Sequence, residues 1–144
     1  MIEQDTVKLL RECDAGVKMG IESIEDVLGH VRSHTMERQL TECKQAHAAL
    51  GSELQTLLDR YHDAGKNPPA LASAMSEMMT NLKLAVNETD ATIASVMTDG
   101  CNMGVKSLNR YLNQYKAADE VSKDIAKRLI NLEAKLAVDL RAYL

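Results

Sequence analysis

The feature that most constrains this chain is a nine-residue segment that occurs twice. Residues 100–108 read Gly-Cys-Asn-Met-Gly-Val-Lys-Ser-Leu, and residues 16–24 read Gly-Val-Lys-Met-Gly-Ile-Glu-Ser-Ile. The copies align without a gap, with Gly20 opposite Gly104, and they share Gly, Met, Gly and Ser at matched positions. An internal repeat of this kind predicts a fold built from two related halves.

A weaker match extends the repeat to the later part of each half. Three leucines on each side correspond at a nearly equal offset, which pairs Leu50, Leu54 and Leu58 with Leu136, Leu140 and Leu144. The same register aligns His47 with Glu133. We therefore expect each half to be a pair of helices, with the second pair a copy of the first.

Long amphipathic helices are predicted along the whole chain, because apolar residues recur every three or four positions. The sequence has only seven Gly, two adjacent Pro and no Phe or Trp, so little interrupts a helix. The expected long helices cover 3–31, 36–62, 90–115 and 119–143, and a connecting helix covers 70–86. A connection of that length can return along the bundle, which makes the second and third long helices parallel.

These expectations define the predicted fold as an all-α, ferritin-like four-helix bundle in one domain, residues 1–144. The helix over 36–62 has the most regular inward stripe: Met36, Leu40, Cys43, His47, Leu50, Leu54, Leu57 and Tyr61. The stripe expected on the third long helix is Ile93, Met97, Gly100, Gly104, Leu108, Tyr111 and Tyr115.

Four short motifs resemble those of ferritin-like bundles of unknown function found in bacteria. They are the segment from Asp14 to Gly20, Glu-Arg-Gln-Leu at 37–40, Met-Thr-Asn-Leu-Lys at 79–83, and Asp99-Gly100. The resemblance covers nearly the whole chain and implies a fold. It implies no activity, because that branch has none that is settled.

The sequence lacks the ligand pattern of di-iron bundles, which use Glu-x-x-His motifs on two of their helices. No Glu-x-x-His occurs anywhere in the chain. Instead, Cys43 and His47 lie one turn apart on one helix face, where both side chains could ligate a metal. With Cys13 and Glu133 they complete a candidate four-ligand set, and the alternative is a core histidine hydrogen-bonded to its neighbours.

The repeated glycines are predicted to mediate helix packing. Gly16 and Gly20 lie on one side of the first helix, and Gly100 and Gly104 lie on the same side of the third. We expect Gly20 and Gly104 to face a close contact between these two helices, since small residues allow backbones to approach. The alternative is that this stripe is a dimer interface.

Composition excludes several classes of function. The net charge is −4 with Lys and Arg interleaved among Asp and Glu, which is unlike a nucleic-acid-binding surface. No stretch approaches the ~18 apolar residues of a membrane span, and three widely spaced cysteines do not form a disulfide framework. These features predict a soluble, cytoplasmic protein.

The leading hypothesis is a non-enzymatic bundle without a cofactor that acts through protein contacts, as a homo-oligomer. A rival hypothesis is a metal-binding or redox bundle that holds a transition metal with His47, Cys43, Cys13 and Glu133. A third is a ligand-sensing domain with an apolar central pocket.

Overall fold

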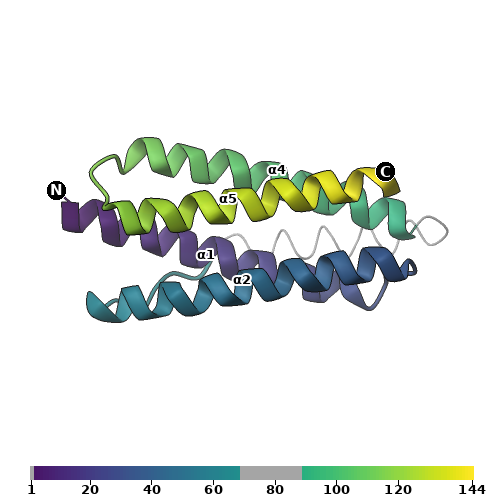
Figure 1. Cartoon of the computed structure of the whole chain (residues 1–144), viewed down its shortest axis with the longest axis horizontal. Helices are drawn as coiled ribbons and strands as arrows, with labels where there is room; N and C mark the ends of the chain where they lie inside the picture. The colour runs from purple at the N-terminus through teal and green to yellow at the C-terminus, as the bar shows by residue number, and fades with distance from the viewer. Residues whose placement is uncertain (1, 69–88) are drawn as a thin grey trace.

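Four long helices make up the regular structure of the computed structural model, which describes residues 2–68 and 89–144. Their bounds are Ile2–Leu28 for α1, His34–Arg60 for α2, Thr89–Gln114 for α4 and Glu120–Leu140 for α5. A 3₁₀ turn, Arg141–Tyr143, follows α5 (Figure 1). The all-α, four-helix prediction is confirmed, whereas the helix expected over 70–86 lies outside the described residues.

Capping residues explain where two of the helices begin. The Ser33 hydroxyl accepts a hydrogen bond from Met36 N at 3.3 Å, and the Asp119 carboxylate accepts one from Ser122 N at 2.8 Å. These side chains satisfy amide groups that the first turn of a helix leaves free. The first helix ends at Leu28, directly before Gly29, so the predicted end at residue 31 is three residues too far.

The four helices form two antiparallel pairs, α1 with α2 and α4 with α5 (Figure 1). Between the pairs, α2 packs on α5, and α1 packs on both α4 and α5. Helix α2 ends where α1 begins, whereas α4 begins at the opposite end of the bundle, so α2 and α4 run in the same direction. The predicted parallel course of the second and third long helices is therefore present.

Each helix pair is tied to the other at the turn between its helices. Backbone amides of Arg32 and Ser33, in the α1–α2 turn, donate to the Asp90 carboxylate at the start of α4, at 2.8 and 3.0 Å. At the opposite end, Ala117 N donates to the Asp5 carboxylate of α1 at 3.0 Å. Asp90 of the second pair thus binds the turn of the first pair, and Asp5 of the first pair binds the turn of the second pair.

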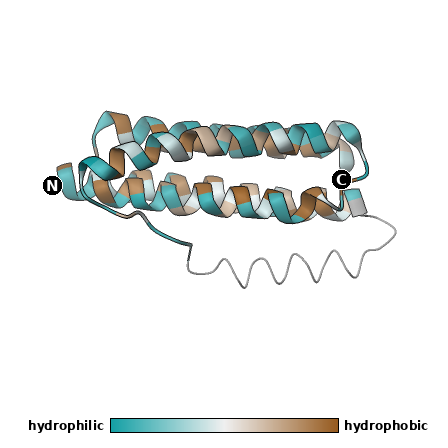
Figure 2. Ribbon diagram, turned by 90° about the horizontal axis from the view of Figure 1, so that it is seen from below, coloured by the Kyte–Doolittle hydropathy of each residue, from teal (hydrophilic) through white to brown (hydrophobic). Residues whose placement is uncertain are grey.

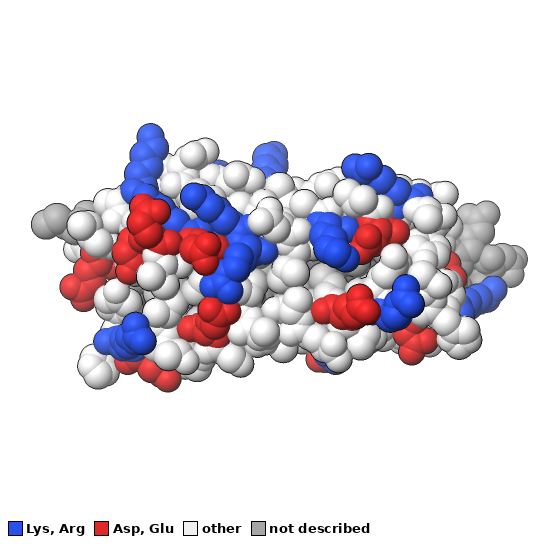
Figure 3. Space-filling view, viewed as in Figure 1, with Lys and Arg blue, Asp and Glu red and all other residues white. Residues whose placement is uncertain are grey.

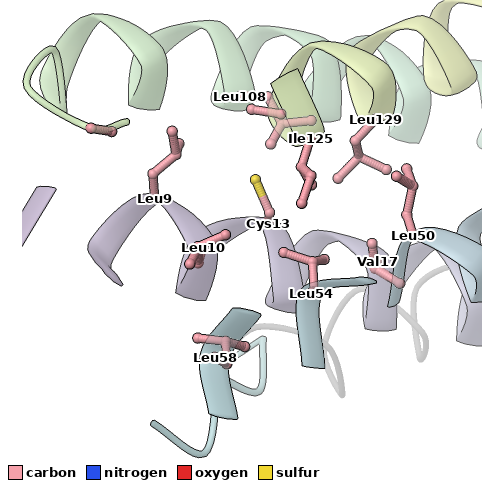
Figure 4. Close-up of a cluster of buried hydrophobic side chains, with 12 residues drawn as sticks. Leu9, Leu10, Cys13, Val17, Leu50, Leu54, Leu58, Leu108, Ile125 and Leu129 are labelled. Carbon is pink, nitrogen blue, oxygen red and sulfur yellow. The ribbon is translucent and has the colours of Figure 1, made fainter. Parts of the chain in front are cut away.

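The core consists of two apolar clusters, one towards each end of the bundle. One is built around residues 24–43 of the first helix pair and includes Ile24, Val27, Met36 and Leu40. The other contains Leu9, Leu10, Leu54, Leu58 and Leu129, among others (Figure 4). Hydrophilic and hydrophobic residues alternate along each of the helices (Figure 2), as expected for amphipathic helices.

The segment after α2 is fixed against α1 by a buried carboxylate. Asp14, 5% exposed, accepts hydrogen bonds from Lys66 N at 2.9 Å and from Lys18 Nζ at 2.7 Å. Lys66 Nζ also pairs with Glu12. Gly65 makes this approach feasible, because its φ of 84° is favourable only for glycine and a Cβ there would overlap Asp14 Oδ2.

Replacing Gly65 with alanine is expected to lower the free energy of unfolding by about 1–3 kcal/mol, through backbone strain and displacement of Asp14. Urea denaturation measures the change. Gly29→Ala is the matched control, because nothing lies within 4 Å of the Cβ position at Gly29. Equal stability of the two variants would show that Asp14 does not hold this segment.

Candidate functional site

One residue from each helix forms a polar layer between the two apolar clusters. We call Gly20 of α1, His47 of α2, Gly104 of α4 and Glu133 of α5 the central layer. On α2, for example, Cys43 belongs to one cluster and Leu50 to the other, with His47 between them. The central layer therefore separates the apolar interior of the bundle into two parts.

His47 and Glu133 contact each other across the two helix pairs. His47 Nε2 lies 3.5 Å from Glu133 Oε1, and the side chains are 2% and 12% exposed. His47 Nδ1 lies 2.8 Å from the carbonyl oxygen of Cys43, one turn earlier on the same helix. Both imidazole nitrogens thus face oxygen atoms.

This arrangement requires a proton between the imidazole and the carboxyl group. A carbonyl oxygen only accepts hydrogen bonds, so His47 Nδ1 must donate to Cys43 O. If Nε2 and Glu133 were both unprotonated, two acceptors would face each other in a buried site. The favourable state is an imidazolium that donates from Nδ1 to Cys43 O and from Nε2 to Glu133.

The pKa of His47 agrees with a charged imidazole. Burial would lower this pKa, but hydrogen bonds to Cys43 and Glu133 outweigh burial and raise it from 6.5 to about 10. His47 is therefore protonated at neutral pH. A buried cation of this kind is stable only with a counter-charge, which Glu133 supplies.

Two cysteines flank the pair. Cys43 Sγ lies 3.5 Å from His47 Nδ1, and Cys101 on α4 lies near Glu133. Burial, followed by the nearby Glu133 and Cys43, raises the pKa of Cys101, which keeps its thiol protonated and able to donate. Among the described residues, no Cα atoms of α2 and α4 lie within 8 Å of each other. A disulfide between Cys43 and Cys101 would therefore require backbone movement.

The repeated glycines leave room for this pair. A Cβ on Gly20 would stand 2.7 Å from Cδ2 and Nε2 of His47, and a Cβ on Gly104 would stand 3.1 Å from Glu133 Oε2. The expectation that both glycines face an α1–α4 contact is therefore wrong. Each faces the polar side chain of the other helix in its own pair, and each allows that side chain to lie close to the backbone.

The other two repeated glycines have lesser roles. Nothing lies within 4 Å of the Cβ position at Gly100, so the prediction that Gly100 packs inward is wrong. Its neighbour Cys101 is buried instead, at 3% exposed. Gly16 makes an ordinary contact with Leu129, at 3.4 Å from the Cβ position.

The structure brings together three of the four predicted metal ligands, Cys43, His47 and Glu133. Cys13 lies in the other part of the core, among leucine side chains (Figure 4), and burial followed by Glu12 and Asp14 raises its pKa to about 12. Cys43 and Glu133 contact different nitrogens of one ring. Within residues 2–68 and 89–144, no three His, Cys, Asp or Glu side chains are placed to hold a metal ion.

The charge on His47 predicts a pH dependence of stability. Because the folded-state pKa is raised, the pair stabilises the fold fully below about pH 6.5 and loses this effect as the pH rises to about 10. We expect the difference in unfolding free energy between wild type and His47→Gln to shrink over that range. Urea denaturation at a series of pH values measures it, and a constant difference would contradict a charged His47.

Comparisons of the chain with protein-family models, with curated proteins and with solved structures found no match. Among the helices that the structure describes, none is both long enough and apolar enough to cross a membrane. The function is therefore inferred from the central layer and the outer surface.

Proposed function

We propose that this chain is a non-enzymatic, ferritin-like bundle that acts through protein contacts, most simply with further copies of itself. The observation that carries the proposal is the closed state of the central layer. His47 and Glu133 satisfy each other, and apolar clusters cover them on both sides. A catalytic pair must be reachable by its substrate, whereas a pair enclosed in this way stabilises a scaffold.

The directions of the helices support the ferritin-like part of the proposal. Helix α2 ends at one end of the bundle and α4 begins at the other, so a short turn cannot join the two antiparallel pairs (Figure 1). This order of helix directions is found in bundles with one long crossover.

The outer surface supports contact with other proteins. Positive and negative side chains are interspersed over the face shown in Figure 3, without a large area of one sign. Large apolar side chains are exposed on α4 and α5, including Met103, which is 66% exposed, and Val121, which is 56% exposed. Exposed apolar side chains contribute to association when a second surface covers them.

Light scattering of the purified protein over a range of concentrations tests self-association. We expect an oligomer, and we expect Met103→Glu to weaken it more than Asn102→Glu, which adds the same charge at an exposed neighbour. A strict monomer at high concentration would contradict self-association.

Metal analysis tests the alternative that the bundle binds a metal. The proposal predicts no stoichiometric metal in the purified protein. Stoichiometric metal that is lost in His47→Ala would overturn the structural role of the central layer.

A further inference from the structure

The two halves of the central layer carry opposite charges. The first helix pair, α1 and α2, supplies Gly20 and His47, and the second pair, α4 and α5, supplies Gly104 and Glu133. Within each pair the glycine faces the ionisable side chain in the same way. The residues aligned by the sequence repeat, His47 and Glu133, therefore meet across the interface between the pairs.

We propose that the His47–Glu133 contact is a recognition element, which makes the inner face of the α1–α2 pair fit an α4–α5 pair and reject a second α1–α2 pair. The complementary partner is the second half of the same chain or that of another copy. Polar residues at single buried positions set register and partner choice in other helical assemblies.

Pairing of like halves would place identical side chains at the centre of the bundle. Two α1–α2 pairs would bring His47 against a second His47, so both imidazoles would lack the Glu133 counter-charge. Two α4–α5 pairs would bring two Glu133 carboxylates together in a buried site. Both arrangements are costly, because a buried charge without an opposite partner destabilises strongly.

The apolar clusters cannot make this distinction. Leu50 and Leu54 of the first half align with Leu136 and Leu140 of the second, and all four are buried. Leucine contacts would form equally well in correct and incorrect pairings, since apolar attraction is not directional. Within the buried interior, discrimination between the halves therefore depends on the central layer.

The surroundings of this contact would allow the histidine and the glutamate to exchange places. On α2, the carbonyl oxygen of Cys43, one turn before His47, accepts a hydrogen bond from His47 Nδ1. On α5, Leu129 occupies the corresponding position, one turn before Glu133. An imidazole at position 133 could donate to the carbonyl of Leu129 in the same way. Cys43, whose Sγ lies 3.5 Å from His47 Nδ1, and Cys101, beside Glu133, are the further titratable groups at this contact.

A charge exchange in the full-length chain tests the proposal. His47→Glu and Glu133→His each place like groups together, and the double variant His47→Glu/Glu133→His restores opposite ones. Thermal and urea denaturation of the four proteins give the energetic coupling. We expect each single variant to be strongly destabilised and the double variant to recover most of the loss. A double variant that is destabilised by the sum of the two single effects would overturn the proposal.

A second variant separates recognition from stability. His47→Met/Glu133→Met fills the central layer with adaptable apolar side chains, so we expect a folded protein of similar or higher stability. Without the charged contact, we expect more than one pairing, seen as additional amide resonances in two-dimensional NMR or mixed oligomers in native mass spectrometry. A single set of resonances and one species identical to wild type would overturn the proposal.

Discussion

Replacing Glu133 with glutamine is expected to lower the free energy of unfolding at neutral pH by about 3 kcal/mol. The change preserves the shape of the side chain but leaves the His47 imidazolium buried without a counter-charge, and breaking a buried pair costs about 3–5 kcal/mol. The expected value lies at the low end, because His47 can lose its proton in the variant. Urea denaturation at constant pH measures the loss.

Glu53→Gln is the matched control for this prediction. Glu53 also joins α2 to α5, through two hydrogen bonds to Arg128 at 2.8 and 3.0 Å, but the side chains of Glu53 and Arg128 are 49% and 43% exposed. A pair on the surface contributes within about 1 kcal/mol. Similar losses in Glu53→Gln and Glu133→Gln would contradict the assignment of a special role to the buried pair.

The pH dependence of Glu133→Gln should also differ from that of wild type. Without the carboxylate, one of the hydrogen bonds that raise the folded-state pKa of His47 is lost, so this pKa is expected to fall below the wild-type value of about 10. The stabilisation that depends on the charge of His47 would then be lost at a lower pH in the variant than in wild type.

Replacing Gly20 with leucine is expected to destabilise the bundle by about 3 kcal/mol. Even a Cβ at this position would stand 2.7 Å from two ring atoms of His47, so a larger side chain must displace the imidazole from Glu133. Overpacking of a core costs about 1–3 kcal/mol, and loss of the buried pair adds to it. Thermal denaturation followed by circular dichroism measures the effect.

Gly100→Leu is the control, because Gly100 belongs to the same repeated motif but has nothing within 4 Å of its Cβ position. A leucine there should stabilise the exposed helix by about 0.5–1 kcal/mol relative to glycine. If Gly20→Leu were tolerated as well as Gly100→Leu, the glycines of the central layer would not be needed to accommodate His47.

The helices and much of the core could be predicted from periodicity, because the buried face of a long amphipathic helix has an apolar residue at every third or fourth position. From Met36 to Leu54, every residue of the predicted stripe on α2 is buried. After Leu54 the buried residue is Leu58, whereas Leu57 is only partly buried. A one-residue error of this kind arises because the helical period is not an integer.

The central layer could be predicted only in part. The stripe placed His47 inside the bundle, and the repeat aligned it with Glu133. The contact between them, however, depends on how the two helix pairs are placed relative to each other, which periodicity within a single helix does not specify. The same limitation explains the incorrect partner assigned to Gly20, since a helical wheel gives a direction but does not identify the neighbour.

The sequence does not identify Cys101 as buried, because the third helix carries two adjacent candidates for one inward position. The repeated motif favours Gly100, but Cys101, four residues after Met97, is the buried residue. The helix face of Cys13 predicts a place near the histidine, whereas its position along α1 places it in the other apolar cluster.

The central claim is that His47 is a charged imidazolium paired with Glu133 inside the bundle. Nitrogen-15 NMR of the imidazole rings tests it most directly, because the shifts of Nδ1 and Nε2 report whether each carries a proton. We expect both nitrogens of His47 to be protonated at neutral pH and to remain so until the pH approaches about 10. Loss of a proton near the ordinary value of 6.5 would contradict the claim.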